Sequence, residues 1–518
     1  MSDEFAPVEV REVEAKFRVH PPFEIPDLVG PRTGAASVDP TREEELRAVY
    51  WDTSDLRLAR EGISLRYRSG EGAGKDGWHL KLPVRESRVP DAGTAARDEL
   101  HAVGDPEEIP AELRELVTPW VRTAVLGPVA TLVTRRSAQV LRDDAGEPLV
   151  ELTDDLVSVL SSGHIAGRFR EIEVESLGGG VEAIEAVGSV LRAAGAVGGE
   201  FLPKVVRALG PQATADPDPP PPAPFDLDEP ARVALRDVLR RNVRLLLATD
   251  TPVRRGQPDS VHQMRVTARR LRSALKVFGP IEDLEWAESL RAELKWLADT
   301  LGGARDSEVL LERLLGDLAA LPDDLVVGPV RAKVEREVGG VLSTTSDAVQ
   351  ETLRSERYVV LLERLVDAAW EPMTSPHGEK PTEDVVPKLV LACYERVAKG
   401  ARALAKADAT DETWHRVRIH AKQLRYTCDS LVAIYGKPAR ALAAQAEAVQ
   451  EVLGEHQDAT VAAGVIFALA TARGSGSAGF TLGLMHARET AAAQDARAEF
   501  ARVWAKASRS RYRRWLTT

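Results

Sequence analysis

Short segments in which polar and apolar residues alternate run through the first 210 residues of the chain. The clearest are residues 12–18, 63–68, 78–82 and 171–175. A period of two predicts β-strands that have one polar and one apolar face. Because glycine-rich turns separate several of these segments, we predict many short strands in one sheet that closes into a barrel or a sandwich.

The chain from residue 225 onward has a different pattern. Its apolar residues recur every three or four positions, and Ala, Leu, Arg and Glu are abundant, which predicts α-helices. Between the two parts, residues 211–224 contain a run of prolines that excludes a helix or a central strand and predicts a semi-rigid spacer. We therefore expect a multidomain α+β protein with a strand-rich domain at 1–210, a linker at 211–224 and a helical domain at 225–518.

The composition is that of a globular protein with a hydrophobic core. The chain has 518 residues, of which 44% are hydrophobic and 29% charged. Its net charge of −12 argues against a polyanion as partner. However, the first 224 residues hold 25 basic and 39 acidic residues, whereas the rest holds 43 basic and 41 acidic ones. The acidity therefore lies in the strand-rich part.

Two further features bear on where the protein works. No stretch of 18 apolar residues occurs, and the start, Met1-Ser2-Asp3-Glu4, is acidic, so we expect neither a transmembrane helix nor a signal peptide. Cys393 and Cys428 are too few for a disulfide framework. We therefore expect a cytoplasmic protein.

Like charges share single strand faces in the strand-rich part. Glu12 and Glu14 lie on one face, and the segment 171–175 places three glutamates on another. Like charges two positions apart repel each other unless a cation lies between them. Other segments carry bases in the same pattern, namely Arg66, Arg68, His79 and Lys81. If these faces point into a barrel, carboxylates that suit a hard cation meet bases that suit phosphate.

These motifs, in this order, resemble those of the CYTH family, the triphosphate tunnel metalloenzymes. The resemblance covers residues 5–210. Its motifs are Glu12-x-Glu14-x-Lys16, Tyr50-Trp51-Asp52-Thr53, Gly62-Ile63-Ser64-Leu65-Arg66-x-Arg68, Trp78-x-Leu80-Lys81-x-Pro83, Glu171-x-Glu173-x-Glu175 and Lys204-x-x-Arg207. It implies an eight-stranded antiparallel β-barrel with a hydrophilic tunnel, in which triphosphates are hydrolysed or cyclised with Mg²⁺ or Mn²⁺.

The same resemblance implies a role for each matching residue. The expected catalytic residues are Lys16, Glu12 and Glu14. The expected metal ligands are Glu12, Glu14, Asp155, Glu171 and Glu173, and the expected phosphate-binding residues are Arg66, Arg68, Lys81, Arg136 and Lys204. In one departure, Pro203 stands where the family often has Ser. In addition, the pairs Arg135-Arg136 and Asp154-Asp155 leave the strand register open by one residue.

The helical part carries two cationic stripes at matching positions. The first consists of His262, Arg265, Arg269, Arg272 and Lys276, whose spacing of three or four residues places them on one helix face. The second, 153 residues later, consists of His415, Arg418, Lys422 and Arg425. An apolar stripe accompanies each: Met264, Ala268, Leu271, Leu275 and Phe278, and then Val417, Ala421, Leu424, Cys428 and Leu431. Residues 301–306 and 453–458 also match, so we predict an internal duplication of a helical bundle.

The stripes predict a polyanion as ligand. A solvated helix face normally interleaves acids with bases, and these stripes contain no acid. They also contain no aromatic residue for base stacking, so inorganic polyphosphate fits better than nucleic acid. Both stripes resemble the paired motifs of the CHAD domain, over residues 225–518. That resemblance implies two similar helical bundles, related by pseudo-twofold symmetry around a basic groove, in which the stripe residues bind polyphosphate.

The sequence thus predicts a cytoplasmic phosphohydrolase of the CYTH–CHAD type. The expected activity is metal-dependent hydrolysis of inorganic triphosphate, or of a short polyphosphate or a triphosphate ester. The helical domain is expected to bind polyphosphate and to bring the protein to polyphosphate granules. Two alternatives stay open: a catalytically inactive polyphosphate-binding module, and an adenylate cyclase or thiamine triphosphatase, whose organic-base pocket the sequence does not identify.

Overall fold

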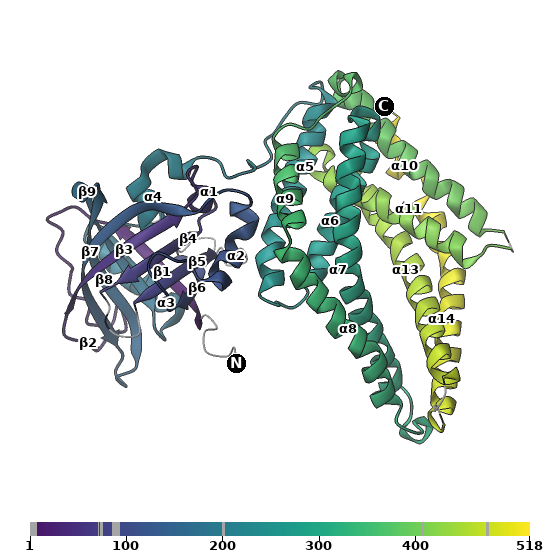
Figure 1. Ribbon diagram of the computed structural model, residues 1–518, viewed down its shortest axis with the longest axis horizontal. Helices are drawn as coiled ribbons and strands as arrows, with labels where there is room; N and C mark the ends of the chain where they lie inside the picture. Colours follow the sequence, from purple (N-terminus) through teal and green to yellow (C-terminus); the bar gives the residue numbers. More distant parts are fainter. Residues whose placement is uncertain are drawn as a thin grey trace. The chain divides into compact units, whose positions relative to one another are not determined.

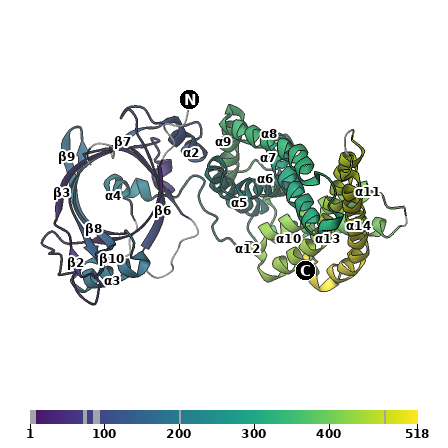
Figure 2. The ribbon, with the colours of Figure 1, turned by 90° about the horizontal axis from the view of Figure 1, so that it is seen from below.

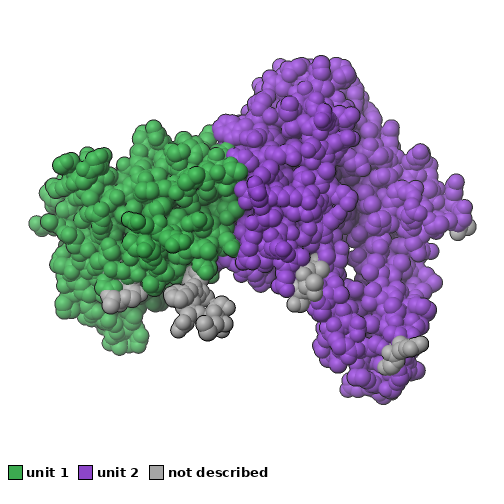
Figure 3. All heavy atoms as spheres, viewed as in Figure 1, with its two compact units in different colours: residues 1–218 green, residues 219–518 purple. Residues whose placement is uncertain are grey.

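The computed structural model divides the chain into two compact units, residues 1–218 and residues 219–518 (Figure 3). The structure describes residues 8–70, 72, 76–84, 94–198, 202–406, 408–472 and 476–517. The division falls inside the proline-rich segment. On the barrel side of it, residues Gly210–Thr214 form a short 3-10 helix, η1.

The first unit is a closed barrel of eight antiparallel strands, as predicted (Figure 2). Around the ring, neighbouring strands are β1 (Val8–Arg18), β6 (Thr94–Ala102), β5 (Gly77–Pro83), β4 (Ser64–Ser69), β3 (Arg42–Asp52), β7 (Gly127–Arg142), β8 (Pro148–Ser161) and β9 (His164–Ser176). The pairing of β9 with β1 closes the ring. Two short strands, β2 (Ser37–Val38) and β10 (Val197–Gly198), pair with β7 and β1.

The apolar faces of the strands point out of the barrel and pack against helices. Ile172 and Val174 of β9 pack against α3 (Gly180–Ala193), and Trp78 and Leu80 of β5 pack against α2 (Ala111–Val121). Alternation along a strand then directs the polar residues inward. These two hydrophobic cores therefore lie outside the ring, and the strands direct mainly polar side chains into it.

A short helix, α4 (Lys204–Leu209), closes one end of the barrel interior. Figure 2 shows it inside the ring of strands. Its residues Val205 and Val206 pack with Leu132 of β7 and Val157 of β8, which share strand faces with Arg136 and Asp155. These apolar contacts hold α4 in place, and Lys204, its first residue, faces the polar interior.

The second unit is helical, as predicted (Figure 1). Its first five helices are α5 (Ala231–Arg254), α6 (Ser260–Val277), α7 (Leu284–Ala319), α8 (Val330–Arg354) and α9 (Glu356–Trp370). The next five are α10 (Thr382–Leu404), α11 (Asp411–Ser430), α12 (Val432–Tyr435), α13 (Lys437–Thr471) and α14 (Ala478–Ala507). Within the described residues, no helix combines the length and the apolar character needed to cross a bilayer.

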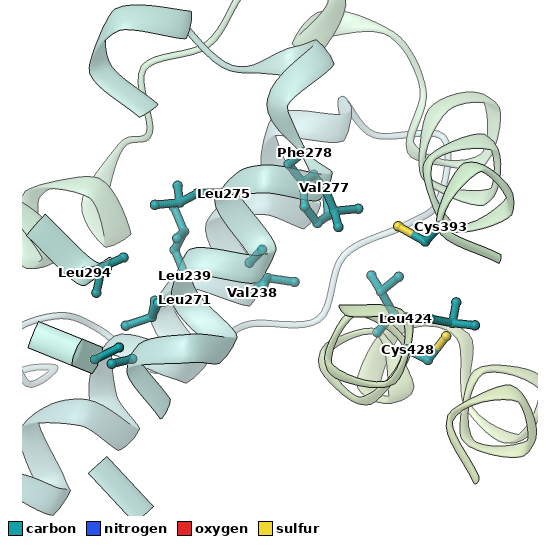
Figure 4. Packing of buried hydrophobic residues seen from close by; sticks show 14 of the residues in the cluster. Val238, Leu239, Leu271, Leu275, Val277, Phe278, Leu294, Cys393, Leu424 and Cys428 are labelled. Carbon is teal, nitrogen blue, oxygen red and sulfur yellow. The ribbon is translucent and has the colours of Figure 1, made fainter. Parts of the chain in front are cut away.

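One hydrophobic core joins the two sets of helices. All ten residues of the two predicted apolar stripes, which lie on α6 and α11 and on the residue directly after each helix, are buried in it. Figure 4 shows Leu271 and Leu275 of α6, and Phe278 directly after it, together with Leu424 and Cys428 of α11. Cys393 and Cys428 are free, buried thiols that contribute to this packing. The apolar stripes therefore position α6 and α11, and with them the cationic stripes.

Candidate functional site: a charged barrel cavity and a cationic helix junction

The polar strand faces enclose a cavity of about 550 Å³ in the barrel. Nine of the residues predicted for this site line the cavity: Glu12, Glu14, Lys16, Arg66, Arg68, Lys81, Arg136, Glu173 and Lys204. Asp155 and Glu171 are buried beneath them, in contact with Lys204. The structure thus brings the whole predicted set together, while the role of each residue stays a prediction.

The strand register decides which members of the two ambiguous pairs face inward. Arg136 lines the cavity and donates two hydrogen bonds to Asp155, of 2.9 and 2.7 Å. Arg135 is exposed, with Nε 3.5 Å from a carboxylate oxygen of Glu45. Asp154 faces away from the cavity and accepts two hydrogen bonds from Arg170 on the neighbouring strand.

Acidic side chains dominate the cavity wall formed by β1 and the adjoining part of β9. Lys81 Nζ lies 2.5 Å from Glu12 Oε2, and Lys16 Nζ lies 3.4 Å from Glu14 Oε2. Burial raises the pKa of Glu12 to about 8 and that of Glu175 to about 7. Burial also opposes ionisation of Glu14, but the charges of Lys16, Lys81 and Arg97 together outweigh it and lower the pKa of Glu14. This wall therefore holds more carboxylate than its lysines compensate.

A denser charge network lies deeper, next to α4. Lys204 Nζ is 2.8 Å from Asp155, 2.9 Å from Glu173 and 3.2 Å from Glu171. Burial alone would lower the pKa of Lys204, but these three carboxylates raise it above its usual value. Lys16 also donates to Glu173, and the surrounding cations overcome burial and hold the pKa of Glu173 well below its usual range. Lys204 and Glu173 of this network are therefore both charged at neutral pH.

In the helical unit, an arginine of each cationic stripe is held by an aspartate of a neighbouring long helix. Arg265 of α6 donates to both carboxylate oxygens of Asp306 on α7, at 2.7 and 3.1 Å. Arg418 of α11 donates to Asp458 on α13 at 3.4 Å. The two pairs occupy matching positions in the two halves of the unit, 153 and 152 residues apart. In each half, an ion pair to the neighbouring long helix therefore holds the stripe arginine in place.

The two cationic stripes approach each other where α6 and α11 pack. Burial lowers the pKa of Arg269, and so do the charges of Arg265, Arg272 and Arg418. Burial, followed by the charges of Arg418 and Arg269, lowers the pKa of Lys422 to about 7. Charges from both helices thus act on one another. We call the four residues at this contact the junction cluster: Arg265, Arg269, Arg418 and Lys422.

Other stripe residues lie outside the junction cluster. Arg425 pairs with Glu447 at 2.6 Å, and His415 Nδ1 lies 2.9 Å from Gln457 Oε1. The remaining ones are His262 and Arg272, which are half-buried, and Lys276, which is exposed. His456 is buried and stacks on Trp414, with ring centroids 4.9 Å apart.

Comparisons with known proteins match both units. A CYTH domain model matches residues 10–189, and a CHAD domain model matches residues 237–466. Two Mycobacterium tuberculosis proteins, uncharacterized Rv2226 of strain H37Rv and MT2285 of strain CDC 1551, are each 34% identical over 526 residues, which covers 94% of this chain and 94% of each relative. The chain belongs to the CYTH–CHAD family. It therefore pairs a domain of a family that includes triphosphatases and cyclases with a domain associated with polyphosphate binding.

Solved structures resemble parts of the chain. PptA from Streptomyces chartreusis is 23% identical, with a TM-score of 0.47, and covers 53% of this chain and 99% of its own. HpAC1 from Hippeastrum carries an adenylyl cyclase name and is described as having a dominant triphosphatase activity. It is 17% identical, with a TM-score of 0.25, and covers 39% of this chain and 98% of its own.

Three carboxylates of the CYTH cavity supply donors that suit a divalent cation. Among the described residues, no group of three or more His, Cys, Asp or Glu side chains is arranged as a metal site. However, Glu14 and Glu175 are register partners on β1 and β9, and Glu12 lies two residues before Glu14 on the same face of β1. These three supply hard oxygen donors on the wall where carboxylate is in excess, so their chemistry fits Mg²⁺ or Mn²⁺.

Glu99 of β6 is a cavity residue that the sequence reasoning missed. It lies 2.9 Å from His79 Nδ1, 3.4 Å from Lys81 and 3.7 Å from Arg66. Burial opposes its ionisation, but Lys81, His79 and Arg66 hold the pKa of Glu99 well below its usual range. The available signal was the alternation Arg97-x-Glu99-x-His101, three polar residues that all line the cavity.

Proposed function

We propose that the CYTH unit is a metal-dependent phosphohydrolase that acts on inorganic triphosphate, or on a related short polyphosphate or triphosphate ester. The single observation that carries this proposal is the shared cavity, in which carboxylates and bases from seven strands and α4 face one space of about 550 Å³. A triphosphate needs both kinds of group, since bases bind its outer oxygens and a carboxylate-held cation binds oxygens of neighbouring phosphates.

The cation would be Mg²⁺ or Mn²⁺, held by Glu12, Glu14 and Glu175. Glu171, Glu173 and Asp155, the other predicted ligands, lie deeper and contact Lys204 and Arg136. A bound divalent cation supplies Lewis-acid chemistry, because it withdraws charge from phosphate oxygens and lowers the pKa of a bound water.

The chain's own bases position the substrate and stabilise charge. Arg66, Arg68 and Arg136 line the cavity as fixed guanidinium groups that suit phosphate oxygens. Lys81 and Lys16 now contact glutamates, and a bound phosphate offers their ammonium groups another anion. Because these charges are positioned before the substrate enters, they stabilise the charge that develops on the transferring phosphoryl group without reorganisation.

The proline at position 203 is compatible with this function. Pro203 precedes α4 with φ −53° and ψ 148°, a conformation that proline adopts without strain. Lys204 follows as the first residue of the helix and still contacts the network of carboxylates. The departure from the family pattern therefore leaves the closing lysine inside the cavity, which favours an active tunnel over an inactive one.

The direct test is phosphate release by the full chain from triphosphate, ATP and thiamine triphosphate, with Mg²⁺ or Mn²⁺. We expect release from triphosphate, and a decrease of at least about 100-fold in the double variant Glu12→Gln, Glu14→Gln. Glu9→Gln, on the outer face of β1, is the control and should retain activity. Formation of cyclic AMP from ATP would contradict the proposal and identify the CYTH unit as an adenylate cyclase. No release with any substrate or metal would instead support the alternative of a catalytically inactive polyphosphate-binding module.

We also propose that the CHAD unit binds inorganic polyphosphate through the cationic stripes and brings the protein to polyphosphate granules. The junction cluster supports this, because half-buried cations that lie together require anions. The variant Arg265→Gln, Arg418→Gln should bind long-chain polyphosphate more weakly and with less salt dependence. Arg331→Gln, an exposed position on α8, is the control. Unchanged binding in the double variant would contradict the proposal.

A further inference from the structure

Lys422 is the one lysine of the junction cluster. At the matching position, the other half of the CHAD unit has an arginine. Lys422 lies on α11, and its counterpart 153 residues earlier is Arg269 on α6. The charged groups that act on it are Arg418 of its own helix, Arg265 and Arg269 of α6, and Asp458 of α13. Three cations and one carboxylate therefore surround the Lys422 amine.

The nearby carboxylates are already engaged by arginines. Asp306 accepts both hydrogen bonds of Arg265, and Asp458 accepts one from Arg418. Among the residues that the structure describes, neither Arg269 nor Lys422 has a carboxylate oxygen within 4.0 Å. The half-buried Lys422 amine thus lies in a region of positive potential without an ion-pair partner.

Arginine and lysine respond differently to such a position. A guanidinium keeps its proton in proteins, whereas an ammonium that is buried among cations releases its proton readily. Consistently, burial and then the charges of Arg418 and Arg269 bring the pKa of Lys422 to about 7. Polyanion oxygens at the cluster would offset the arginine charges and favour the ammonium form again.

We propose that Lys422 takes up a proton when a polyanion binds to the junction cluster, so that binding of polyphosphate is coupled to pH. This inference rests on the proposed binding function of the CHAD unit. Below pH 7 the ammonium is already present and binding needs no proton. Above it, binding must include protonation, so the association constant should fall by up to about tenfold per pH unit.

Calorimetric titration of the full chain with long-chain polyphosphate, in buffers of different ionisation enthalpy, measures the protons taken up directly. A long chain keeps the contribution of its terminal phosphates small. At pH 8 we expect uptake of close to one proton per protein molecule in the wild type and almost none in Lys422→Arg. The association constant of Lys422→Arg should also change little between pH 6 and 9. Lys295→Arg, an exposed position on α7 outside both stripes, is the control and should behave as the wild type.

The outcomes separate this inference from the function on which it rests. If the wild type binds polyphosphate without proton uptake, or if Lys422→Arg retains the uptake, the role of Lys422 is wrong and the binding function stands. If the wild type binds no polyphosphate between pH 6 and 9, the proposed function itself fails. Circular dichroism confirms that each variant is folded.

Discussion

Arg136 of β7 and Asp155 of β8 are register partners, joined inside the barrel by two parallel hydrogen bonds of 2.9 and 2.7 Å. Asp155 is fully buried, and Lys204 Nζ lies 2.8 Å from its other side. A planar guanidinium that meets a carboxylate in this way forms one of the stronger charged contacts in proteins. The pair therefore ties β7 to β8 at the level of the predicted phosphate-binding residues.

Replacing Arg136 by methionine should destabilise the barrel. The change leaves Asp155 buried with Lys204 as its one remaining cationic partner among the described residues, and breaking a buried pair costs about 3 kcal/mol or more. Arg135→Met is the matched control, because Arg135 is the exposed neighbour in a loose surface pair and should cost less than about 1 kcal/mol. Hydrogen exchange of peptides from β7 and β8 in the full chain measures both. Equal losses would contradict the assigned register.

His79 should be a neutral imidazole, although the sequence placed it among the bases of the cavity. Its Nδ1 lies 2.9 Å from the Glu99 carboxylate, and burial, with Arg66 and Arg68, lowers the pKa of His79 to about 4. At pH 6 an ordinary histidine is largely protonated, so the difference is measurable. We expect nitrogen-15 imidazole spectra of the full chain to show His79 neutral at pH 6, with the proton on Nδ1.

The variant His79→Asn identifies the signal, because it should remove that resonance and no other. Protonation of His79 at pH 6 would mean that Glu99 raises the pKa of His79 more than burial and the cavity arginines lower it. It would also return His79 to the set of cations that attract phosphate.

Much of the CYTH fold and its site follows from the sequence, because strand alternation and motif order constrain each other. Glu12, Glu14 and Arg66 had to share one side of the sheet, and closure of the barrel brought them together. The choice between Arg135 and Arg136 did not follow, since a shift of one residue reverses every side chain and only the pairing with β8 decides it. Glu99 escaped notice because a single acid on a strand has no repetition to mark it.

The CHAD stripes were readable for a different reason. The first stripe recurs 153 residues later as the second one, and such a repetition is not expected of a chance run of charges. What the sequence did not reveal is that the charge of Arg269 lowers the pKa of Lys422 through the packing of α6 on α11. That proximity depends on tertiary packing, which no local pattern encodes. The partners Asp306 and Asp458 lie in segments whose repetition was visible, but their contacts with Arg265 and Arg418 were not.

Glu282, in the turn before α7, should make the CHAD unit less stable as the pH rises. Only 3% of its surface is exposed, and neither carboxyl oxygen has a hydrogen-bond partner among the described residues. Burial raises its pKa to about 9 in the folded state, whereas an unfolded glutamate titrates near 4.5. Between these values the folded chain keeps a proton that the unfolded chain has released. The free energy of unfolding therefore falls with rising pH across this window, by up to about 1.4 kcal/mol per pH unit.

Glu282→Gln should remove this dependence, because the amide is uncharged at every pH in the window. We expect the variant to match the wild type near pH 5 and to exceed it in stability at pH 8, by at least about 1 kcal/mol. Urea denaturation followed by circular dichroism at pH 5 and at pH 8 measures the difference. Glu285→Gln, an exposed position three residues along, is the control and should keep the wild-type slope. A wild-type slope that persists in Glu282→Gln would assign the pH dependence to another group and show that the buried carboxyl is compensated in the folded state.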